Sequence, residues 1–559
     1  MPPLEEIETS ASAKRFGRLA YMEASIGTVS CFFCPGDPMK TERSSTPRRT
    51  IRCLLRPLTP APWRMAPPIA ALGLSLGLLA GCGSPVVNPV TGQAERSVMD
   101  ERAEIAAGQE GHQQVLSEHG VVKNPNLQAY VNQVGQRLAA QSHRADLKWT
   151  FTALDSPEIN AFALPGGYVY VTRGLLAYME SEADMAGVIG HEIGHVTARH
   201  GAQRATRSQN AGLGVMAASV LGAVLESQGI GGAADLSGRV AQGVASGYIA
   251  SYSREQELQA DTLGAEYLAR NRYNPSNMVD VIQVLKSQET YAADQARADG
   301  KPAPSGADWL SSHPSNEQRL QAIRQIAAGY QGQYGDDGRE RYLQAIRGMA
   351  FGDSPEQGLV RGQDFLHPDL GIAVTAQPGW RIQNSPSALT IVSPQGDAAL
   401  RMLAVPPKSG SNHEDILKNG LGAAQGQVTR GNLNGLAATH FAGVRRLPNG
   451  QTQPLQATIV TGPKNAHYAL LYLAANDSAK ARAMPAMNAI EKSFRPMTAA
   501  DARNAHPWVV DLAPYPRGGF AALQSAGVST EQQLRLLNGL YGGEAAPRVG
   551  QLVKVVGVR

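Results

Sequence analysis

The strongest constraint on this 559-residue chain is a pair of histidines inside an apolar helical segment. Residues 181–197 place apolar side chains at helical spacing and contain no proline, which predicts an uninterrupted helix. His191 and His195 are four residues apart, so they share one helix face and can hold one metal ion together. Glu192 is rotated by about 100° from His191, which directs a carboxylate toward the open side of the metal. The sequence therefore predicts a metal site with an adjacent general base.

This His-Glu-x-x-His spacing is typical of zinc peptidases, in which a third protein ligand completes the site. A metzincin would carry a glycine seven residues and a histidine ten residues after His191. Those positions are Ala198 and Gly201, which excludes that class. His200 would lie on the opposite side of a continuing helix, so we expect it to be a hydrogen-bonded or solvated histidine rather than a ligand.

The acidic candidates for the third ligand lie on a second predicted helix. Ser253 suits an N-cap, and the helical pattern runs to about Arg270. Glu257 and Asp261 are four residues apart and share one face, so Glu257 can bind the metal while Asp261 accepts an N–H from a ligand imidazole. Two alternatives remain open from the residues alone: Glu255 as the ligand, or a charged face that only meets solvent.

Several motifs, in order, resemble the CAAX-prenyl-protease/HtpX-type zinc metallopeptidases, metallopeptidase family forty-eight. They are the His-Glu-x-x-His segment, Ser-Arg-x-x-Glu-x-x-Ala-Asp some sixty residues later, and residues 154–176 and 312–320. The resemblance covers residues 88–328 and is strongest to the soluble periplasmic lipoprotein branch. It implies a mainly helical, gluzincin-type zincin domain holding one Zn²⁺ through His191, His195 and Glu257.

The resemblance also implies a peptide-binding edge strand above the zinc helix, around residues 160–162 and 168–171. For Tyr168 and Tyr170 we prefer ordinary cross-strand packing. His313 precedes a proline and is expected in a turn, which the resemblance places at the rim of the cleft. There it could stabilise the oxyanion, or occupy the fourth zinc position and keep the enzyme latent; a histidine that only packs is the third alternative.

The N-terminus predicts export and lipidation. Residues 69–80 are an apolar run too short to span a bilayer but suited to a signal-peptide core. The run ends in Leu-Ala-Gly-Cys82, which resembles a bacterial lipoprotein cleavage site, and Gly83 favours the outer membrane. No cysteine follows Cys82, so no disulfide is expected in the folded domains. We interpret the residues before about 54 as an over-long predicted start, and give Cys31-x-x-Cys34 no metal or redox role.

The chain after residue 81 is too long for one core, so several domains are expected. The predicted fold class is α+β multidomain, with these parts: a lipid-anchored linker (82–98), the zinc metallopeptidase domain (99–350), an α+β accessory domain (360–497) and a LysM-like or degenerate interaction module (505–559). The accessory domain resembles PsbP/Mog-like domains, with a helix expected at 414–424, and its scattered histidines favour binding or scaffolding. The last module implies possible peptidoglycan contact. Residues 211–224 are too short to span a membrane and are interpreted as a mobile helical hairpin or lid beside the cleft, with a packed core helix as the alternative.

Charge excludes nucleic acid as a partner. Of the 51 lysines and arginines and the 47 aspartates and glutamates, 10 and 6 lie in residues 1–81, so the remaining chain is neutral. The resemblance then implies a zinc endopeptidase of the bacterial periplasm that cleaves misfolded or unassembled envelope proteins. The alternative is a chaperone-like outer-membrane assembly factor that keeps a latent metal site.

Overall fold

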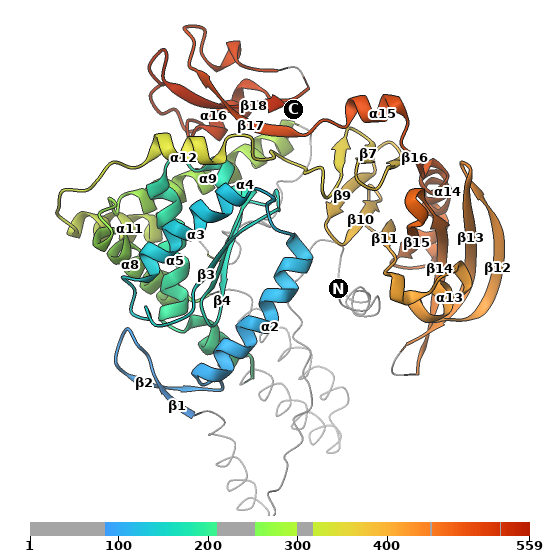
Figure 1. The fold of residues 1–559 in the computed structure, drawn as a ribbon, viewed down its shortest axis with the longest axis horizontal. Helices are drawn as coiled ribbons and strands as arrows, with labels where there is room; N and C mark the ends of the chain where they lie inside the picture. Colours follow the sequence, from blue (N-terminus) through green and yellow to red (C-terminus); the bar gives the residue numbers. More distant parts are fainter. Residues whose placement is uncertain (1–83, 210–251, 299–312, 314–316, 448–449, 526) are drawn as a thin grey trace, which may run out of the picture. The chain divides into compact units, whose positions relative to one another are not determined.

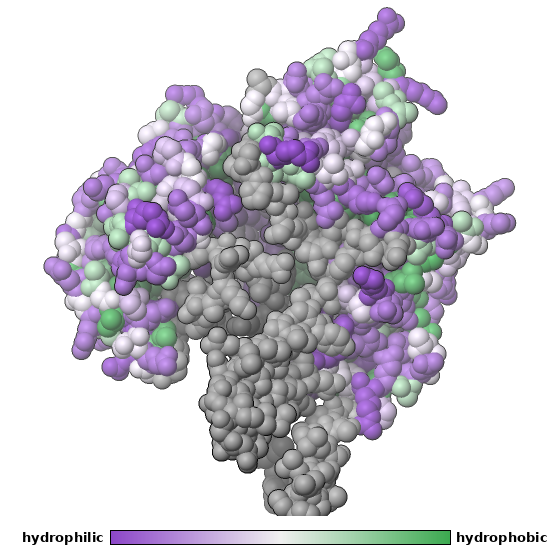
Figure 2. Space-filling model, turned by 180° about the vertical axis from the view of Figure 1, so that it is seen from behind, coloured by the Kyte–Doolittle hydropathy of each residue, from purple (hydrophilic) through white to green (hydrophobic). Residues whose placement is uncertain are grey.

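The computed structural model describes residues 84–209, 252–298, 313, 317–447, 450–525 and 527–559. The predicted signal peptide, Cys82 and the lid interpretation for residues 211–224 all lie outside this part. The described chain is α+β, as predicted, with helices and several separate sheets (Figure 1). Its helices include none with the length and apolar character needed to cross a membrane. Hydrophilic residues predominate among the coloured atoms of the face in Figure 2.

The first half of the described chain is mainly helical and surrounds a small sheet. Its helices are α2 (Glu101–His119), α3 (Pro125–Ala139), α4 (Arg173–Tyr178), α5 (Glu182–Thr197), α8 (Arg254–Arg270), α9 (Asn277–Ala298), α11 (Glu317–Gly329) and α12 (Arg339–Ile346). Its sheet consists of β3 (Thr150–Leu154), β4 (Ala161–Leu164) and β5 (Tyr168–Thr172). The predicted helices at the two histidines and after Ser253 are thus present as α5 and α8.

The three-stranded sheet has the order β3-β5-β4, with β3 parallel and β4 antiparallel to β5. The placement of residues 168–171 at the sheet edge is therefore wrong, because β5 is hydrogen-bonded on both sides. Residues 161 and 162 do belong to an edge strand, β4. The ring of Tyr170 stacks on Phe162 of β4 with 4.9 Å between centroids, which confirms the packing interpretation for that tyrosine.

Helices α5 and α8 lie unusually close together. A Cβ on Gly194 of α5 would stand 2.9 Å from the backbone oxygen of Ala260, and one on Gly264 of α8 would stand 3.1 Å from the backbone nitrogen of His191. Only glycine permits this approach. Ser253 caps α8 through a capping box, as the sequence predicted in part, and so fixes where the acidic helix begins.

Helix α5 ends at Thr197, and the chain turns sharply before the next helical residues, 200–209. Arg199 makes this turn with a φ of 59°, in the left-handed region. Its guanidinium donates to Glu104 Oε1 at 3.2 Å and to the Met99 carbonyl at 2.9 Å, which holds the turn in place. The helix does not continue through His200, so the expectation that this residue lies opposite the site is wrong. The expected role of a hydrogen-bonded histidine is confirmed by its contacts with His195 and Gln259.

Residues 84–97, expected to be part of a linker, form an antiparallel hairpin of β1 (Ser84–Val87) and β2 (Ala94–Ser97). The Asn88 amide donates to the Ala198 carbonyl at 3.3 Å. The Gln203 amide donates to Glu95 Oε2 at 2.7 Å. The hairpin is thereby attached to the C-terminal end of the histidine helix.

The second half contains two antiparallel sheets. One buried cluster includes side chains from both sheets, and a second lies on the seven-stranded sheet. The seven-stranded sheet has the order β12-β13-β14-β15-β11-β10-β9 and comprises β9 (Arg381–Ser385), β10 (Ala388–Val392), β11 (Ala398–Ala404), β12 (Ala423–Leu433), β13 (Leu436–Arg446), β14 (Thr452–Thr461) and β15 (His467–Ala474). The four-stranded sheet has the order β16-β8-β7-β6 and comprises β6 (Leu359–Arg361), β7 (Asp364–His367), β8 (Ile372–Thr375) and β16 (Arg495–Pro496). The helical elements are η1 (Pro407–Ser409), α13 (His413–Asp415), η2 (Ile416–Gly420), η3 (Pro463–Asn465) and α14 (Asp477–Ser493).

The helix expected over residues 414–424 is only partly present. Helical structure there comprises α13 and the π-helical turn η2, and strand β12 already begins at Ala423. Gly422, with a φ of 67°, turns the chain from helix to strand. The long hairpin of β12 and β13 was not predicted.

The C-terminal segment contains α15 (Ala499–Asn504), β17 (Trp508–Pro514), η4 (Phe520–Ala522), α16 (Glu531–Leu537) and β18 (Leu552–Val558), with β17 antiparallel to β18. Its apolar side chains do not form a separate core within the described residues. They join the cluster that also contains α5, through Val510, Tyr515, Phe520, Leu534, Leu537, Val553 and Val556. The buried Lys554 ammonium donates to the carbonyls of Ala177 at 2.9 Å and Met179 at 2.7 Å, directly before α5. Likeness to a LysM module stays a prediction.

Candidate metal centre

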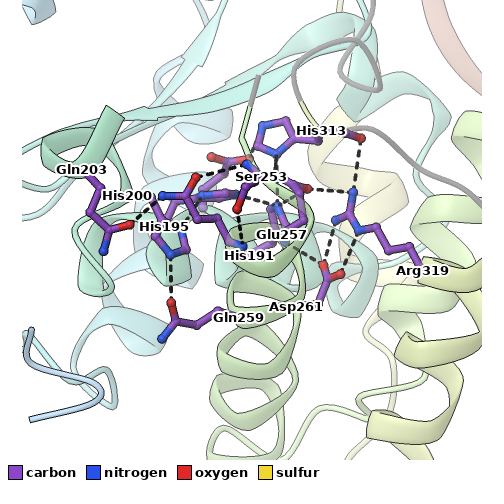
Figure 3. A network of polar contacts seen from close by, with 12 residues as sticks. His191, His195, His200, Gln203, Ser253, Glu257, Gln259, Asp261, His313 and Arg319 are labelled. Atoms are coloured by element: carbon purple, nitrogen blue, oxygen red, sulfur yellow. Dashed lines mark hydrogen bonds and ion pairs between the residues drawn. The ribbon is translucent and has the colours of Figure 1, made fainter. Parts of the chain in front are cut away.

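Four buried side chains from three parts of the sequence converge at one point (Figure 3). One potential ligand atom from each of His191, His195, Glu257 and His313 lies within 4.8 Å of the others. His191 Nε2 is 3.0 Å from His195 Nε2 and 3.2 Å from His313 Nδ1, and His313 Nδ1 is 3.0 Å from Glu257 Oε1. Helix α5 supplies two of these groups and α8 supplies the carboxylate. The structure thus brings His191, His195 and Glu257, the residues favoured as zinc ligands, together with His313.

Asp261 orients the first histidine. Its Oδ1 lies 2.9 Å from Nδ1 of His191, one helical turn after Glu257 on the same face of α8. An imidazole that donates from Nδ1 carries its free lone pair on Nε2, the atom that faces the other ligand groups. The position matches the role that the sequence proposed for Asp261.

A second relay orients His195, and sequence reasoning missed it. His200 Nε2 lies 2.9 Å from Gln259 Oε1, and His200 Nδ1 lies 2.9 Å from His195 Nδ1. The amide oxygen can only accept, so a neutral His200 donates from Nε2 and accepts at Nδ1. Burial lowers the pKa of His200 to about 4, which keeps it neutral. His195 therefore donates from Nδ1 and keeps the Nε2 lone pair toward the site.

Arg319 of α11 supplies the positive charge beside the two acids, and it too was missed as a functional residue. Its Nε and Nη2 each lie 2.8 Å from a different oxygen of Asp261, and its Nη1 is 2.7 Å from Glu257 Oε2. Burial alone would raise the pKa of Asp261, but the Arg319 guanidinium outweighs it and sets that pKa at about 2. The sequence did contain a sign of this role, because Arg319 lies in the family-like segment 312–320, six residues after His313.

The donor set fits a zinc ion. Burial holds the pKa of His195 well below its usual value and lowers that of His313 to about 3, so these imidazoles are neutral and have free lone pairs. Burial raises the pKa of Glu257 to about 7, opposed by Arg319, and a nearby cation would favour its ionised form. Neutral imidazole nitrogens and one carboxylate oxygen are ligands that zinc prefers.

Of the remaining predicted residues, one borders the metal centre, one is exposed away from it, and one is not described by the structure. Glu192 is buried, and its Oε1 lies 3.7 Å from His313 Nε2, so its carboxylate borders the ligand group. Glu255 is exposed at the start of α8, whereas Glu257 is buried in the site, so the geometry favours Glu257 over its rival. Cys82 lies outside the described residues.

Comparison with known proteins gives a family for this region. Residues 125–327 match peptidase family M48. A "Beta-barrel assembly-enhancing protease" of Yersinia pestis is 32% identical over 262 residues, which cover 46% of this chain and 50% of the relative. The protein of the same name from Escherichia coli (strain K12) is 29% identical over 304 residues, covering 54% and 58%. The "Mitochondrial metalloendopeptidase OMA1" of Schizosaccharomyces pombe is 29% identical over 223 residues, covering 39% and 59%.

The chain therefore spans about half the length of the curated relatives it matches. Two solved structures are also similar. LpqN of Mycobacterium tuberculosis, "involved in cell envelope biogenesis", has 23% identity and a TM-score of 0.18 over 24% of this chain and 88% of its own. Cyanobacterial PsbP (CyanoP) of Synechocystis sp. PCC 6803 has 13% identity and a TM-score of 0.18, over 26% and 98%. TM-scores of this size carry no argument, so the PsbP-like assignment of residues 360–497 stays a prediction.

Proposed function

Residues 125–327 form a peptidase family M48 domain, and from this premise we propose that the protein is a zinc-dependent endopeptidase. The observation that carries the proposal is the convergence of His191, His195 and Glu257 beside the buried carboxylate of Glu192. Structural zinc sites are usually closed by four protein ligands, whereas catalytic sites use three and border a general base. Metal binding alone would not require a glutamate at position 192.

His191, His195 and Glu257 would hold the zinc ion, which supplies Lewis-acid activation of water and of the peptide carbonyl. Glu192 accepts a proton from the attacking water and delivers it to the departing amine. Asp261 and His200 hold the two imidazoles in the tautomers that leave Nε2 free. The chain thus supplies the base and the ligands from the two adjacent helices α5 and α8, and their orientation from Asp261 of α8 and from His200, which follows α5.

Removal of zinc tests this function. We expect the purified chain from residue 82 onward to cleave an unfolded protein such as casein, to lose that activity with a chelator, and to regain it when zinc is added back. Cleavage that persists in the chelator would refute the metal-dependent mechanism. The alternative, a chaperone-like assembly factor with a latent site, predicts bound zinc and suppressed aggregation of unfolded protein without cleavage.

The substrate is proposed to be an extended segment of an unassembled envelope protein. Strand β4 is an edge of its sheet and packs against α5, so a peptide could add to it through backbone hydrogen bonds. The relatives named "Beta-barrel assembly-enhancing protease" support β-barrel proteins of the outer membrane as the substrate class. The lipoprotein-like segment before Cys82 supports the periplasm as the compartment. Contact of residues 505–559 with peptidoglycan is a further proposal, and co-sedimentation with purified sacculi tests it.

For His313 we favour the latent state over oxyanion stabilisation. Its Nδ1 lies among the potential ligand atoms, 3.2 Å from His191 Nε2, where it would occupy the coordination position that substrate and water need. His313→Ala is therefore expected to raise basal casein turnover with zinc content unchanged. Lower turnover with unchanged zinc would instead support the oxyanion role, worth about 2.7–4 kcal/mol. If neither quantity changes, the histidine only packs.

We also propose that Cys82 carries the lipid that anchors the protein to the outer membrane, on the strength of the lipoprotein-like segment before it. Cys82→Ser is expected to abolish incorporation of a labelled fatty acid and to release the protein into the soluble periplasmic fraction, because acylation requires the thiol. The measurement is metabolic labelling followed by fractionation of the envelope. A wild-type protein that takes up no label would contradict the anchor.

A further inference from the structure

A tyrosine that sequence reasoning did not single out covers the second histidine of the metal centre. The ring of Tyr252 is stacked on the imidazole of His195, with 4.0 Å between centroids and 28° between planes. The same ring lies 5.4 Å from the imidazole of His313. Tyr252 directly precedes Ser253, whose capping box fixes the start of α8, so the ring has a defined position. It is half-buried, so part of it stays accessible from outside the site.

The phenol of Tyr252 has a charged neighbour on its outer side. The Arg204 guanidinium carbon lies 5.6 Å from the centroid of the tyrosine ring. A guanidinium has donors only, so Arg204 cannot accept the hydrogen of the phenol. Its positive charge beside the ring makes the phenol a stronger donor.

The tyrosine ring also lies on the side of the site that Glu192 borders, because it is 5.4 Å from the His313 ring, whose Nε2 is 3.7 Å from Glu192 Oε1. Burial raises the pKa of Tyr252, and the negative charges of Glu192 and Glu257 raise it further, against the lowering effect of Arg204. A phenol is protonated at neutral pH and can donate a hydrogen bond. A peptide carbonyl attacked by water beside Glu192 would lie on the same side of the site as this ring.

We propose that Tyr252 is a catalytic residue whose hydroxyl donates a hydrogen bond to the carbonyl oxygen as that oxygen becomes negatively charged. The inference deepens the proposed peptidase function and rests on it. No bond to Tyr252 is made or broken: its proton stays on the phenol, while Glu192 carries the proton of the attacking water to the departing amine. A donor fixed before the reaction stabilises charge that develops only in the transition state.

The assignment complements that of His313. A His313 ring whose Nδ1 lies among the ligand atoms has to move before substrate can enter. Tyr252, in contrast, is held from outside by the cap of α8 and by Arg204, so it keeps its position when His313 leaves. His313 is then the group that substrate displaces, and Tyr252 is the hydrogen-bond donor that stays in place.

Tyr252→Phe isolates the hydroxyl, because phenylalanine keeps the ring that stacks on His195. With zinc-loaded protein from residue 82 onward and a defined peptide substrate, we expect kcat to fall by about 10²–10³-fold. KM should stay within about twofold and zinc content unchanged, since a donor used only in the transition state adds no ground-state binding. Tyr541→Phe is the matched control: it removes a hydroxyl that donates to Asp294 Oδ2, and its kinetics should match wild type.

A second measurement does not depend on turnover. Calorimetric binding of a phosphinic peptide, which imitates the tetrahedral intermediate, should weaken by a similar factor in Tyr252→Phe and stay unchanged in Tyr541→Phe. Unchanged kcat and unchanged phosphinate affinity would overturn the proposal. Loss of zinc from Tyr252→Phe would also overturn it, because the residue would then act through His195. If wild-type protein hydrolyses no peptide, the proposed function fails, and phosphinate affinity alone decides the role of the tyrosine.

Discussion

Glu192→Gln is expected to retain its zinc while hydrolysing peptides about 10²–10⁴-fold more slowly than wild type. The amide has nearly the shape of the carboxylate, but it cannot accept the proton of the attacking water. Its neighbours His191 and His195 keep their own hydrogen-bond partners, so the metal ligands stay oriented. Metal analysis and casein turnover, measured on the same preparation, check both halves of the expectation.

Glu255→Gln is the matched control for that experiment. Glu255 is exposed at the start of α8, so the same chemical change there should leave zinc content and turnover at wild-type values. A Glu192→Gln protein that cleaved casein at the wild-type rate would remove Glu192 from the mechanism. A protein that lost its zinc would show instead that Glu192 supports the ligand set.

Glu257→Ala is expected to leave the protein without bound zinc at ordinary zinc concentrations, because one of three ligands is removed. Asp261→Ala should lower zinc affinity by only about 10–100-fold, as for a residue that orients a ligand. It should also lower the melting temperature, because the buried Arg319 loses the partner of its Nε and Nη2 groups. Zinc titration with a competing chelator, together with thermal unfolding, separates the two variants.

Glu255→Ala provides the comparison within the same helix and should bind zinc like wild type. Loss of zinc from Glu255→Ala, with zinc retained in Glu257→Ala, would reverse the ligand assignment. Loss from both would indicate that the start of α8 had unfolded, which the melting temperature would reveal. Zinc binding by the three variants of α8 therefore tests the ligand assignment without any assumption about the substrate.

Features set by local spacing were predictable from the sequence. The period of α5, the cap at Ser253 and the four-residue spacing of Glu257 and Asp261 each depend on neighbouring residues along one helix. The order of the motifs along the chain indicated that α5 and α8 belong to one site. The close approach of these helices was not predictable from local spacing, because it depends on Gly194 and Gly264, whose contacts lie on the other helix.

Features set by contacts between distant residues were not predictable in the same way. His200 meets His195 only because Arg199 turns the chain, and that turn is held by Glu104, which is 95 residues away in sequence. The charge of Arg319 reaches Asp261 from 58 residues away. Helical geometry alone could specify neither contact.

The hairpin of β12 and β13 was missed although a local signal existed. Asn434 and Gly435, with φ values of 49° and 87°, form the turn that joins the two strands. Such an Asn-Gly pair is a strong hairpin signal. It was obscured because β12 is almost entirely exposed, so its sequence lacks the apolar alternation by which a half-buried strand is identified.

The contact between Lys554 and the carbonyls before α5 has a consequence for biosynthesis. Ribosomes make the chain from its N-terminus, and Lys554 follows Ala177 by 377 residues. The core that contains the histidine helix can close only after nearly the whole described chain has been synthesised, and contacts of such long sequence separation form slowly. A nascent or prematurely terminated chain would therefore present both histidines on an incompletely packed helix. We therefore expect packing of the histidine helix to be complete only after translation has passed residue 554.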